Sequence, residues 1–330
     1  MVSILDSPPQ NVQTEIDQLH ALLDSTIPAK RDEPNNPNLL VATWNIKRFG
    51  SLTRKWTSGD GDSPKRDQRS LLGINEIIKR FDVIAIQEVT GDLRALRETM
   101  NYLGPDWGLL MTDVVEGAAG NSERMAFLFN RQRLKPSGLA CELVVPKEWL
   151  DEIGEHALQR QFARTPYAVS FLTNLNHVTF ILVTLHVDYE SKGGDREAEL
   201  NAISRWMHQW ARRSNSWHHN LITLGDFNID RKDDELWQAF TSTGLHVPED
   251  LNLVKRSIFA DDDEPYLNKY YDQIAWFKSG TTTGLQRMDY ITGGGVDFVP
   301  LVYQDMDLTK AQLQHRMSDH YPLWVEFDLG

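Results

Sequence analysis

A carboxylate and an amide stand two residues apart in Leu224-Gly225-Asp226-Phe227-Asn228, directly after an apolar run. The run, residues 221–224, is typical of a buried strand, and the glycine marks its end. Residues two apart on an extended chain point the same way, so Asp226 and Asn228 would project together from a strand end. Active sites of layered folds are often built there. Taken alone, the pattern more commonly marks a turn, so its meaning depends on the rest of the chain.

Other predicted strands also end or begin in polar side chains of the types that serve catalysis or metal binding. Together with Asp226 and Asn228 these side chains are Asn45, Glu88, His186, Asp319 and His320. Strand ends gathered on one edge would bring them into one pocket. Carboxylates and amides suit hard cations such as magnesium, manganese or calcium. The sequence contains no cysteine and histidine cluster with the spacing of a zinc site.

Five short motifs follow one another along the chain in an order that carries a family resemblance. They are WNI (Asn45), QE (Glu88), LH (His186), GDFN (Asp226, Asn228) and SDH (Asp319, His320). In this order they resemble the endonuclease/exonuclease/phosphatase superfamily, from Leu39 to Phe327. The segments NIKRFG (45–50), SERMAFLF (122–129), FARTP (162–166), YDQI (271–274) and MSDHYP (317–322) resemble deoxyribonuclease I in particular. We therefore interpret the chain as a deoxyribonuclease I-like protein.

Strands and helices alternate along the sequence, which predicts a layered α/β architecture. The resemblance implies a four-layer α/β/β/α sandwich, in which two mixed sheets pack face to face. We expect strands at 39–45, 82–88, 124–130, 167–172 and up to His186, and helices at 70–80, 93–103 and 197–213. Residues 39–330 would form this domain.

Residues 1–38 form the predicted N-terminal helical extension and linker. Helical spacing of apolar residues predicts a short amphipathic helix over Gln13–Leu23. Prolines and asparagines make Asp32–Asn38 a linker. The helix either packs on the domain or contacts a partner.

The resemblance assigns two histidines with carboxylate partners to phosphodiester hydrolysis. His320 is the general base, because an imidazole titrates near neutral pH and can accept a proton from water. Asp272 is its expected partner, and Asp289 is the alternative, since other superfamily members carry a similar Asp-Tyr-Ile. His186 is the acid or phosphate clamp, oriented by Glu123.

The remaining site residues are expected to handle metal and phosphate. Asn45, Glu88 and Asp319 would hold a divalent metal, Mg²⁺ or Mn²⁺, with Ca²⁺ also possible. Asp226 and Asn228 would bind a second metal or orient the water and the phosphate, and both one-metal and two-metal schemes fit these ligand types. Arg164, Lys47 and Asn228 are the candidate phosphate contacts.

The composition of the chain limits which binding partners and which cellular compartment we expect for it. The 330 residues include 34 basic and 47 acidic side chains, a net charge of −13, so a bulk basic field for nucleic acid is absent. A local basic patch with divalent cations can still offset phosphate repulsion. A single cysteine, Cys141, excludes a disulfide within the chain and suits a reducing compartment. We expect a cytoplasmic monomer without a membrane segment or an obligate protein partner, and secretion by a non-classical route is left open.

The resemblance implies a DNA endonuclease of low sequence specificity. The alternative is a phosphodiesterase or phosphatase of the same superfamily acting on lipid, inositol-phosphate or nucleotide substrates. A binding or scaffold protein without activity is disfavoured, since all the expected catalytic residue types are present.

One departure from deoxyribonuclease I concerns how the chain would contact DNA. The aromatic residue that precedes the Glu-Arg strand and packs into the minor groove is missing, because Asn121 and Ser122 precede Glu123. The loop Ser51–Arg69 offers a substitute, or is simply a mobile surface loop. Its side chains of interest are Arg54, Lys55, Trp56, Lys65, Arg66 and Arg69, of the types that meet phosphates and stack on a base.

Overall fold

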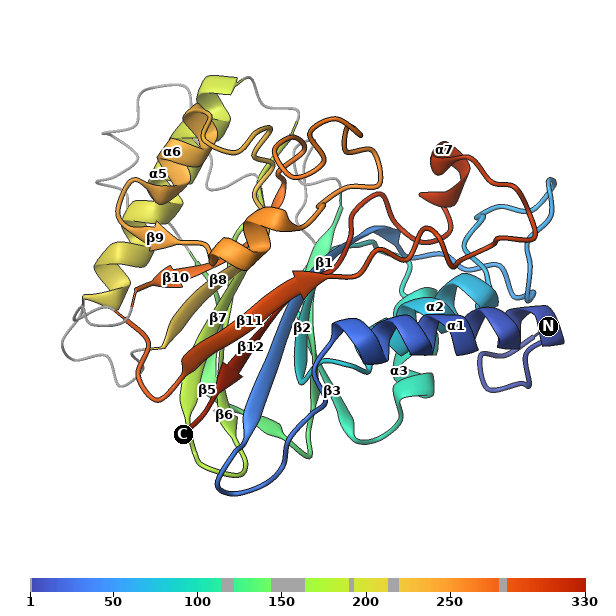
Figure 1. The fold of residues 1–330 in the computed structure, drawn as a ribbon, viewed down its shortest axis with the longest axis horizontal. Helices are drawn as coiled ribbons and strands as arrows, with labels where there is room; N and C mark the ends of the chain where they lie inside the picture. The colour runs from blue at the N-terminus through green and yellow to red at the C-terminus, as the bar shows by residue number, and fades with distance from the viewer. Residues whose placement is uncertain (1, 114–121, 144–163, 190–192, 213–219, 279–283) are drawn as a thin grey trace.

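The computed structural model describes residues 2–113, 122–143, 164–189, 193–212, 220–278 and 284–330 (Figure 1). Their strands form two six-stranded sheets. The first sheet has the spatial order β11 (Asp289–Gly295), β12 (Leu323–Asp328), β1 (Asn38–Phe49), β2 (Val83–Val89), β4 (Arg124–Asn130) and β3 (Trp107–Met111). The second has the order β5 (Leu134–Glu142), β6 (Tyr167–Thr173), β7 (Thr179–His186), β8 (Leu221–Asp226), β10 (Asp272–Phe277) and β9 (Leu245–His246).

Helices cover the outer face of each sheet, which completes four layers (Figure 1). Beside the first sheet lie α1 (Gln10–Thr26), α2 (Gln68–Ile78) and α3 (Arg94–Leu103), and beside the second lie α5 (Gly193–Ala211) and α6 (Glu235–Thr241). A short helix, α7 (Lys310–Leu313), and a 3-10 turn, η1 (Glu249–Leu253), lie in connections. The predicted α/β/β/α sandwich is confirmed.

Each sheet is mixed because it contains one parallel pair among antiparallel neighbours. β1 runs parallel to β2, and β7 runs parallel to β8. Parallel neighbours end on the same edge of a sheet. The carboxyl ends of β1 and β2 therefore lie together, and so do those of β7 and β8.

Alternation along β1 divides the core into two parts. Leu39 and Val41 point into the core between the two sheets, whereas Leu40 and Ala42 join the core beneath α1 and α2. Successive side chains of a strand face opposite sides, so a central strand of a sandwich is apolar on both. All four of these side chains are buried.

The N-terminal helix is part of the packed structure. α1 extends beyond the predicted Gln13–Leu23 at both ends, and its apolar stripe, which includes Ile16 and Leu19, is buried in the core beside the first sheet. The helix therefore packs on the domain. The division at residue 38 stays a sequence-based prediction.

Several element boundaries differ from the predicted ones. β1 continues to Phe49 rather than ending near Asn45, and α5 begins at Gly193 and ends at Ala211, with Arg213 outside the described residues. The sequence did not predict β3, β5, β9, β10 or β11. β5 is mostly exposed on one face, and β11 contains Gly293–Gly295, so neither has a clear apolar pattern. Within the described residues, no helix is both long and apolar enough to cross a membrane.

Candidate functional site

The predicted site residues meet where the two parallel strand pairs end. Asn45 lies on β1, while His186 and Asp226 are the last residues of β7 and β8. Nδ2 of Asn45 donates a hydrogen bond to Oδ2 of Asp226 at 2.9 Å, which joins the two sheets at this edge. The loop that carries His320 reaches the same point. Four side chains that are distant in sequence therefore lie together: Asn45, His186, Asp226 and His320.

The carboxylate of Asp226 is the centre of the cluster. Its Oδ2 atom lies 3.6 Å from Nε2 of His186 and 3.9 Å from Nε2 of His320. Its Oδ1 atom accepts a hydrogen bond of 2.9 Å from the backbone N–H of Asn228. The side chain of Asn228 donates to the carbonyl of Val187 at 2.5 Å, so the loop after β8 is held against the end of β7.

His320 is paired with Asp272. Nδ1 of His320 lies 2.6 Å from Oδ2 of Asp272, whose side chain is fully buried. The alternative, Asp289, is exposed and pairs in register with Asp328, at the end of β12 distant from His320. Burial alone would lower the pKa of His320, but the carboxylates of Asp272, Asp226 and Asp319 raise this pKa well above its ordinary value.

His186 has its own carboxylate. Nδ1 of His186 lies 3.3 Å from Oε2 of Glu123, which also accepts a 2.8 Å hydrogen bond from Nε of Arg164. Burial raises the pKa of Glu123, but His186 and Arg164 outweigh that effect and leave it lowered. Arg164 is itself buried and lies 3.9 Å from Asp188. It thus supports the carboxylate of Glu123. Its direct contact with a substrate phosphate stays a prediction.

The residues expected to hold a metal offer oxygen atoms without partners. Oδ1 of Asn45 and Oδ1 of Asp319 are buried and have no hydrogen-bond partner in the part of the chain that the structure describes. One oxygen of Glu88 accepts a hydrogen bond from the backbone N–H of Arg48 at 2.8 Å. This set fits a hard cation, which needs oxygen ligands. The described residues hold no group of three or more His, Cys, Asp or Glu side chains placed to bind a metal. The candidate set consists of two carboxylates, of Glu88 and Asp319, and the amide of Asn45.

Lys47 adjoins this set. Its ammonium Nζ lies 2.6 Å from Oδ2 of Asp319. Lys47 therefore contacts the carboxylate that is expected to hold the metal, and its contact with a substrate phosphate stays a prediction. The pKa of Asp319 is lowered, because His320 and Lys47 together outweigh the effect of its burial.

Irregular backbone places two of the site side chains. The pairing of β1 with β2 shifts register between Asn45 and Phe49, and Glu88 has a φ of 59°. Such bulges redirect a side chain at a functional edge. Gly225, with a φ of 142°, lies so close to β7 that a Cβ atom would come within 2.2 Å of the Leu185 carbonyl oxygen. Glycine in the GDFN motif is required by this close approach of the strands.

The sequence did not predict the positioning roles of two residues, Ser318 and Arg66. Ser318 is fully buried, and its Oγ donates to the carbonyl of Asn45 at 2.7 Å while accepting from the backbone N–H groups of Lys47 and His320. Arg66 donates to the backbone carbonyls of Lys47, Arg48, Arg316 and Met317. Both residues tie the loop that carries His320 to the end of β1. The serine of the Ser-Asp-His motif is the sequence signal from which the positioning role of Ser318 could have been predicted.

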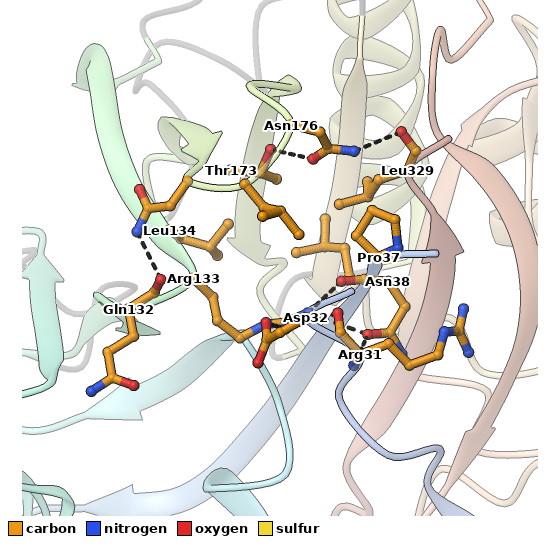
Figure 2. Close-up of a pocket in the computed structure, with 13 residues that line it drawn as sticks. Arg31, Asp32, Pro37, Asn38, Gln132, Arg133, Leu134, Thr173, Asn176 and Leu329 are labelled. Atoms are coloured by element: carbon orange, nitrogen blue, oxygen red, sulfur yellow. Dashed lines mark hydrogen bonds and ion pairs between the residues drawn. The ribbon is translucent and has the colours of Figure 1, made fainter. Parts of the chain in front are cut away.

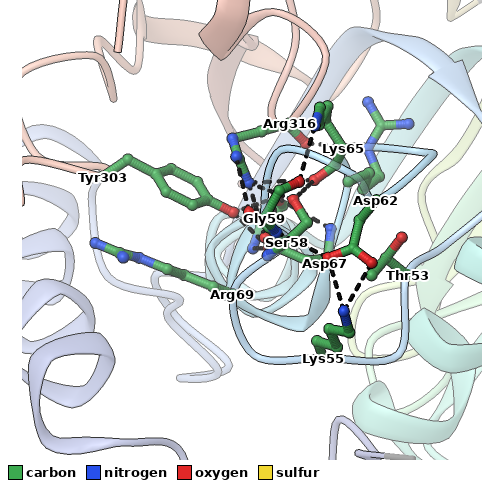
Figure 3. A network of polar contacts seen from close by, with 12 residues as sticks. Thr53, Lys55, Ser58, Gly59, Asp62, Lys65, Asp67, Arg69, Tyr303 and Arg316 are labelled. Carbon is green, nitrogen blue, oxygen red and sulfur yellow. Dashed lines mark hydrogen bonds and ion pairs between the residues drawn. The ribbon is translucent and has the colours of Figure 1, made fainter. Parts of the chain in front are cut away.

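The loop Ser51–Arg69 is ordered by a buried polar network (Figure 3). Asp67 accepts hydrogen bonds from the N–H groups of Ser58 and Ser70 and from Nη1 of Arg316, and Tyr303 also donates to it. Arg66 and Arg69, which the sequence offered as phosphate contacts, are buried in internal contacts instead. The basic character of the loop surface therefore comes from other residues.

A basic cavity of about 600 Å³ lies between this loop and the end of β1. Its lining residues include Lys47, Arg48, Lys65, Thr90 and His315. The one carboxylate in its wall, Asp92, is paired with Arg94 at 2.5 Å. In a chain of net charge −13, this is a local reversal of charge beside the predicted metal residues.

Figure 2 shows a second cavity, of about 270 Å³. It lies beside the start of β1, at the opposite end of that strand from the predicted site. It is formed by the linker before β1, the turn after β4, the turn after β6 and the end of the chain. Its main cation, Arg133, is paired at 2.7 Å with Asp82, which is fully buried. The charge of Arg133 is thereby neutralised, and the cavity lies at the start of β1, away from His186 and His320.

Comparison with known proteins shows the family of the chain. The profile of the Endonuclease/Exonuclease/phosphatase family matches residues 42–320. A protein of Thioalkalivibrio sp. (strain K90mix) named "Deoxyribonuclease" is 26% identical over 299 residues, covering 88% of this chain and 71% of the relative.

Solved structures share the fold at low sequence identity. A mannosyl-6-phosphatase of Bacteroides thetaiotaomicron is 18% identical with a TM-score of 0.58, covering 88% of this chain and 99% of its own. The human Nocturnin catalytic domain is 15% identical with a TM-score of 0.55, covering 91% and 100%. D. rerio TDP2, solved with a single-strand DNA product, is 13% identical with a TM-score of 0.54, covering 88% and 98%. The chain belongs to the endonuclease/exonuclease/phosphatase family, whose members are hydrolases of phosphoester bonds.

Proposed function

We propose that this protein is a divalent-metal-dependent DNA endonuclease of low sequence specificity. The observation that carries the proposal is the convergence of two histidines, each with a carboxylate at its Nδ1 atom, on the single carboxylate of Asp226. A base and an acid on opposite sides of one phosphate are what in-line hydrolysis of a phosphodiester needs.

His320 is proposed as the general base. Asp272 fixes the imidazole so that Nε2 faces the reacting phosphate, and a water there can lose its proton to Nε2. His186, oriented by Glu123, would donate a proton to the leaving oxygen or bind the phosphoryl oxygens. Asp226 and Asn228 would orient the water and the phosphate between the two histidines.

Asn45, Glu88 and Asp319 are the proposed ligands of Mg²⁺ or Mn²⁺. When bound, such a cation neutralises charge on the phosphoryl oxygens. The partnerless Oδ1 atoms of Asn45 and Asp319 support this assignment, since buried oxygens rarely stay without a partner. Lys47, at Asp319, adds a fixed positive charge beside the phosphate position.

The basic cavity supports a polyanionic substrate. A small phosphoester would occupy the space between the histidines, whereas a nucleic acid strand continues beyond it and meets Arg48 and Lys65. The deoxyribonuclease relative supports DNA as the substrate. The fold alone does not select DNA, since a structural neighbour is a mannosyl-6-phosphatase.

The test is nicking of supercoiled plasmid with Mg²⁺ or Mn²⁺. We expect wild-type protein to nick the plasmid, and His320→Ala, Glu88→Ala or EDTA to abolish nicking. Lys135→Ala, which removes an exposed charge from β5, is the matched control and should nick normally. Hydrolysis of bis(p-nitrophenyl) phosphate without plasmid nicking would replace the endonuclease by a small-phosphoester hydrolase. Equal nicking by wild type and variants would mean that the site is wrong.

A further inference from the structure

Aromatic side chains lead outward from His320 to the molecular surface. The ring of Tyr271 lies 5.5 Å from the ring of His320, and the ring of Tyr189 lies 6.2 Å from that of Tyr271 with its plane almost perpendicular. Tyr271 directly precedes Asp272, the partner of His320, and Tyr189 follows His186 by three residues. Tyr189 is therefore attached to the strand that carries His186, and Tyr271 to the strand that carries Asp272, the partner of His320.

The outer ring is exposed but held in place. Tyr189 is 58% exposed, which is unusual for an aromatic side chain beside a buried polar site. The guanidinium of Arg196, on α5, lies 5.4 Å from the centroid of the Tyr189 ring. An arginine over an aromatic face is attracted by it, and the contact restricts the motion of the ring.

Arg196 also belongs to the site. It donates to the backbone carbonyl of Asn228 at 3.0 Å and to Oδ2 of Asp230 at 2.8 Å. The arginine that supports the Tyr189 ring is thus fixed to the loop whose Asn228 contacts Asp226. Tyr189, Tyr271 and Arg196 form one assembly, which we name the tyrosine platform.

From this geometry we infer that the exposed face of Tyr189 stacks an unpaired nucleobase next to the scissile phosphate. The inference rests on the proposed function and specifies its substrate. Stacking needs a free base face, which single-stranded DNA offers and an intact duplex does not. We therefore expect the protein to act more efficiently on single-stranded than on duplex DNA. The platform lies beside the ends of β7 and β8 and offers an aromatic contact, whereas the sequence has no aromatic residue directly before Glu123.

Binding separates the stacking contribution from phosphate contacts. The probes are a labelled ten-residue oligothymidylate and an abasic oligonucleotide of the same length and charge, measured with Glu88→Ala protein, which leaves the platform intact. Adding Tyr189→Ala should weaken binding of oligothymidylate roughly 5- to 140-fold, the range that corresponds to loss of one base–aromatic stack. Binding of the abasic strand should change little. Tyr189→Trp should restore the difference, because an indole also offers a stacking face.

Tyr266 provides the matched control. It is another exposed tyrosine, 40% exposed, in the acidic turn before β10, and Tyr266→Ala should leave both affinities unchanged. Thermal unfolding of each variant checks that the fold is kept. In wild-type protein, cleavage of single strands should exceed cleavage of duplex, and Tyr189→Ala should reduce that preference.

The possible outcomes separate the two proposals. Equal weakening of both probes by Tyr189→Ala, or no weakening of either, would overturn the platform even if plasmid nicking is normal. A base-dependent loss of binding in a protein that nicks no DNA would keep the platform and overturn the endonuclease.

Discussion

At the scale of single residues, the charge around His320 is the most consequential feature. The imidazole is buried between carboxylates, of which Asp272 is in direct contact, and its pKa is raised well above the ordinary value. Only the neutral imidazole can accept a proton from water. The proposed base is therefore active above this pKa, and activity should fall as the pH drops through it.

Replacing Asp272 by Asn tests this arrangement. The substitution removes the negative charge that most strongly raises the pKa of His320, so that pKa falls and the acid limb of the kcat/KM profile should move to lower pH. At the optimum, activity should decrease by roughly 10²- to 10⁴-fold, the usual contribution of a positioned acid or base.

Asp289→Asn is the control for that experiment. Asp289 is exposed at the start of β11 and paired with the far end of β12, so the profile should keep its shape and height. A shift caused by Asp289→Asn rather than Asp272→Asn would reverse the assignment of the histidine partner.

At the scale of elements, α1 supports the loop beside the site. Glu15 of α1 is buried and pairs with Arg69 at 2.5 Å, and it also accepts a hydrogen bond from the backbone N–H of Tyr303. Arg69 follows Asp67, the centre of the network that orders the loop Ser51–Arg69 (Figure 3). Through Glu15 and Arg69, the N-terminal helix thus holds the loop Ser51–Arg69, which forms part of the wall of the basic cavity.

Glu15→Ala should destabilise the fold measurably. Removing one partner of a buried ion pair leaves the other charge buried, at a cost of roughly 3–5 kcal/mol, and the remaining contact of Arg69 with Asp305 places the expected loss toward the lower end. Denaturant unfolding measures this loss. Asp17→Ala, at an exposed position of the same helix, should change the free energy of unfolding by less than about 0.5 kcal/mol. Equal stability of both variants would show that α1 does not anchor the loop.

At the scale of the whole molecule, the two sheets share one core. The ring of Phe171, on β6, lies 5.9 Å from that of Phe127 and 5.4 Å from that of Phe129, both on β4 of the other sheet. Trp276 and Phe327 make a similar contact at 5.1 Å between β10 and β12. The site is formed by strand ends of both sheets, so its geometry depends on this packing.

Phe171→Ala should therefore weaken the entire molecule. Truncating a fully buried phenylalanine costs about 3–5 kcal/mol, and the loss should appear in one transition seen alike by circular dichroism and tryptophan fluorescence. Leu175→Ala, at an exposed position of the following turn, is the control and should leave the transition in place. Separate transitions for the two probes would show that the sheets unfold independently.

The sequence by itself determined the fold class and supplied the candidate site residues that the structure brings together. Apolar runs ending in polar residues marked β1, β2, β7 and β8, because strands buried on both faces leave that pattern in any context. The motif order then assigned the chain to one family, which the matching profile confirms. The same motifs predicted a common site for Asn45, Glu88, His186, Asp226 and His320. The sequence did not predict edge strands such as β5 and β11, because half-exposed or glycine-rich strands lack a continuous apolar run.

Only the tertiary structure decided which side chains face one another. The sequence favoured Asp272 and left Asp289 as the alternative, and the structure decides between them, because β10 begins beside His320 whereas β11 does not. Arg66 and Arg69 looked like surface cations, yet they are buried by contacts with residues distant in sequence. The platform of Tyr189, Tyr271 and Arg196 joins three separate segments. Such pairings arise from the packing of distant elements, which local pattern and composition do not encode.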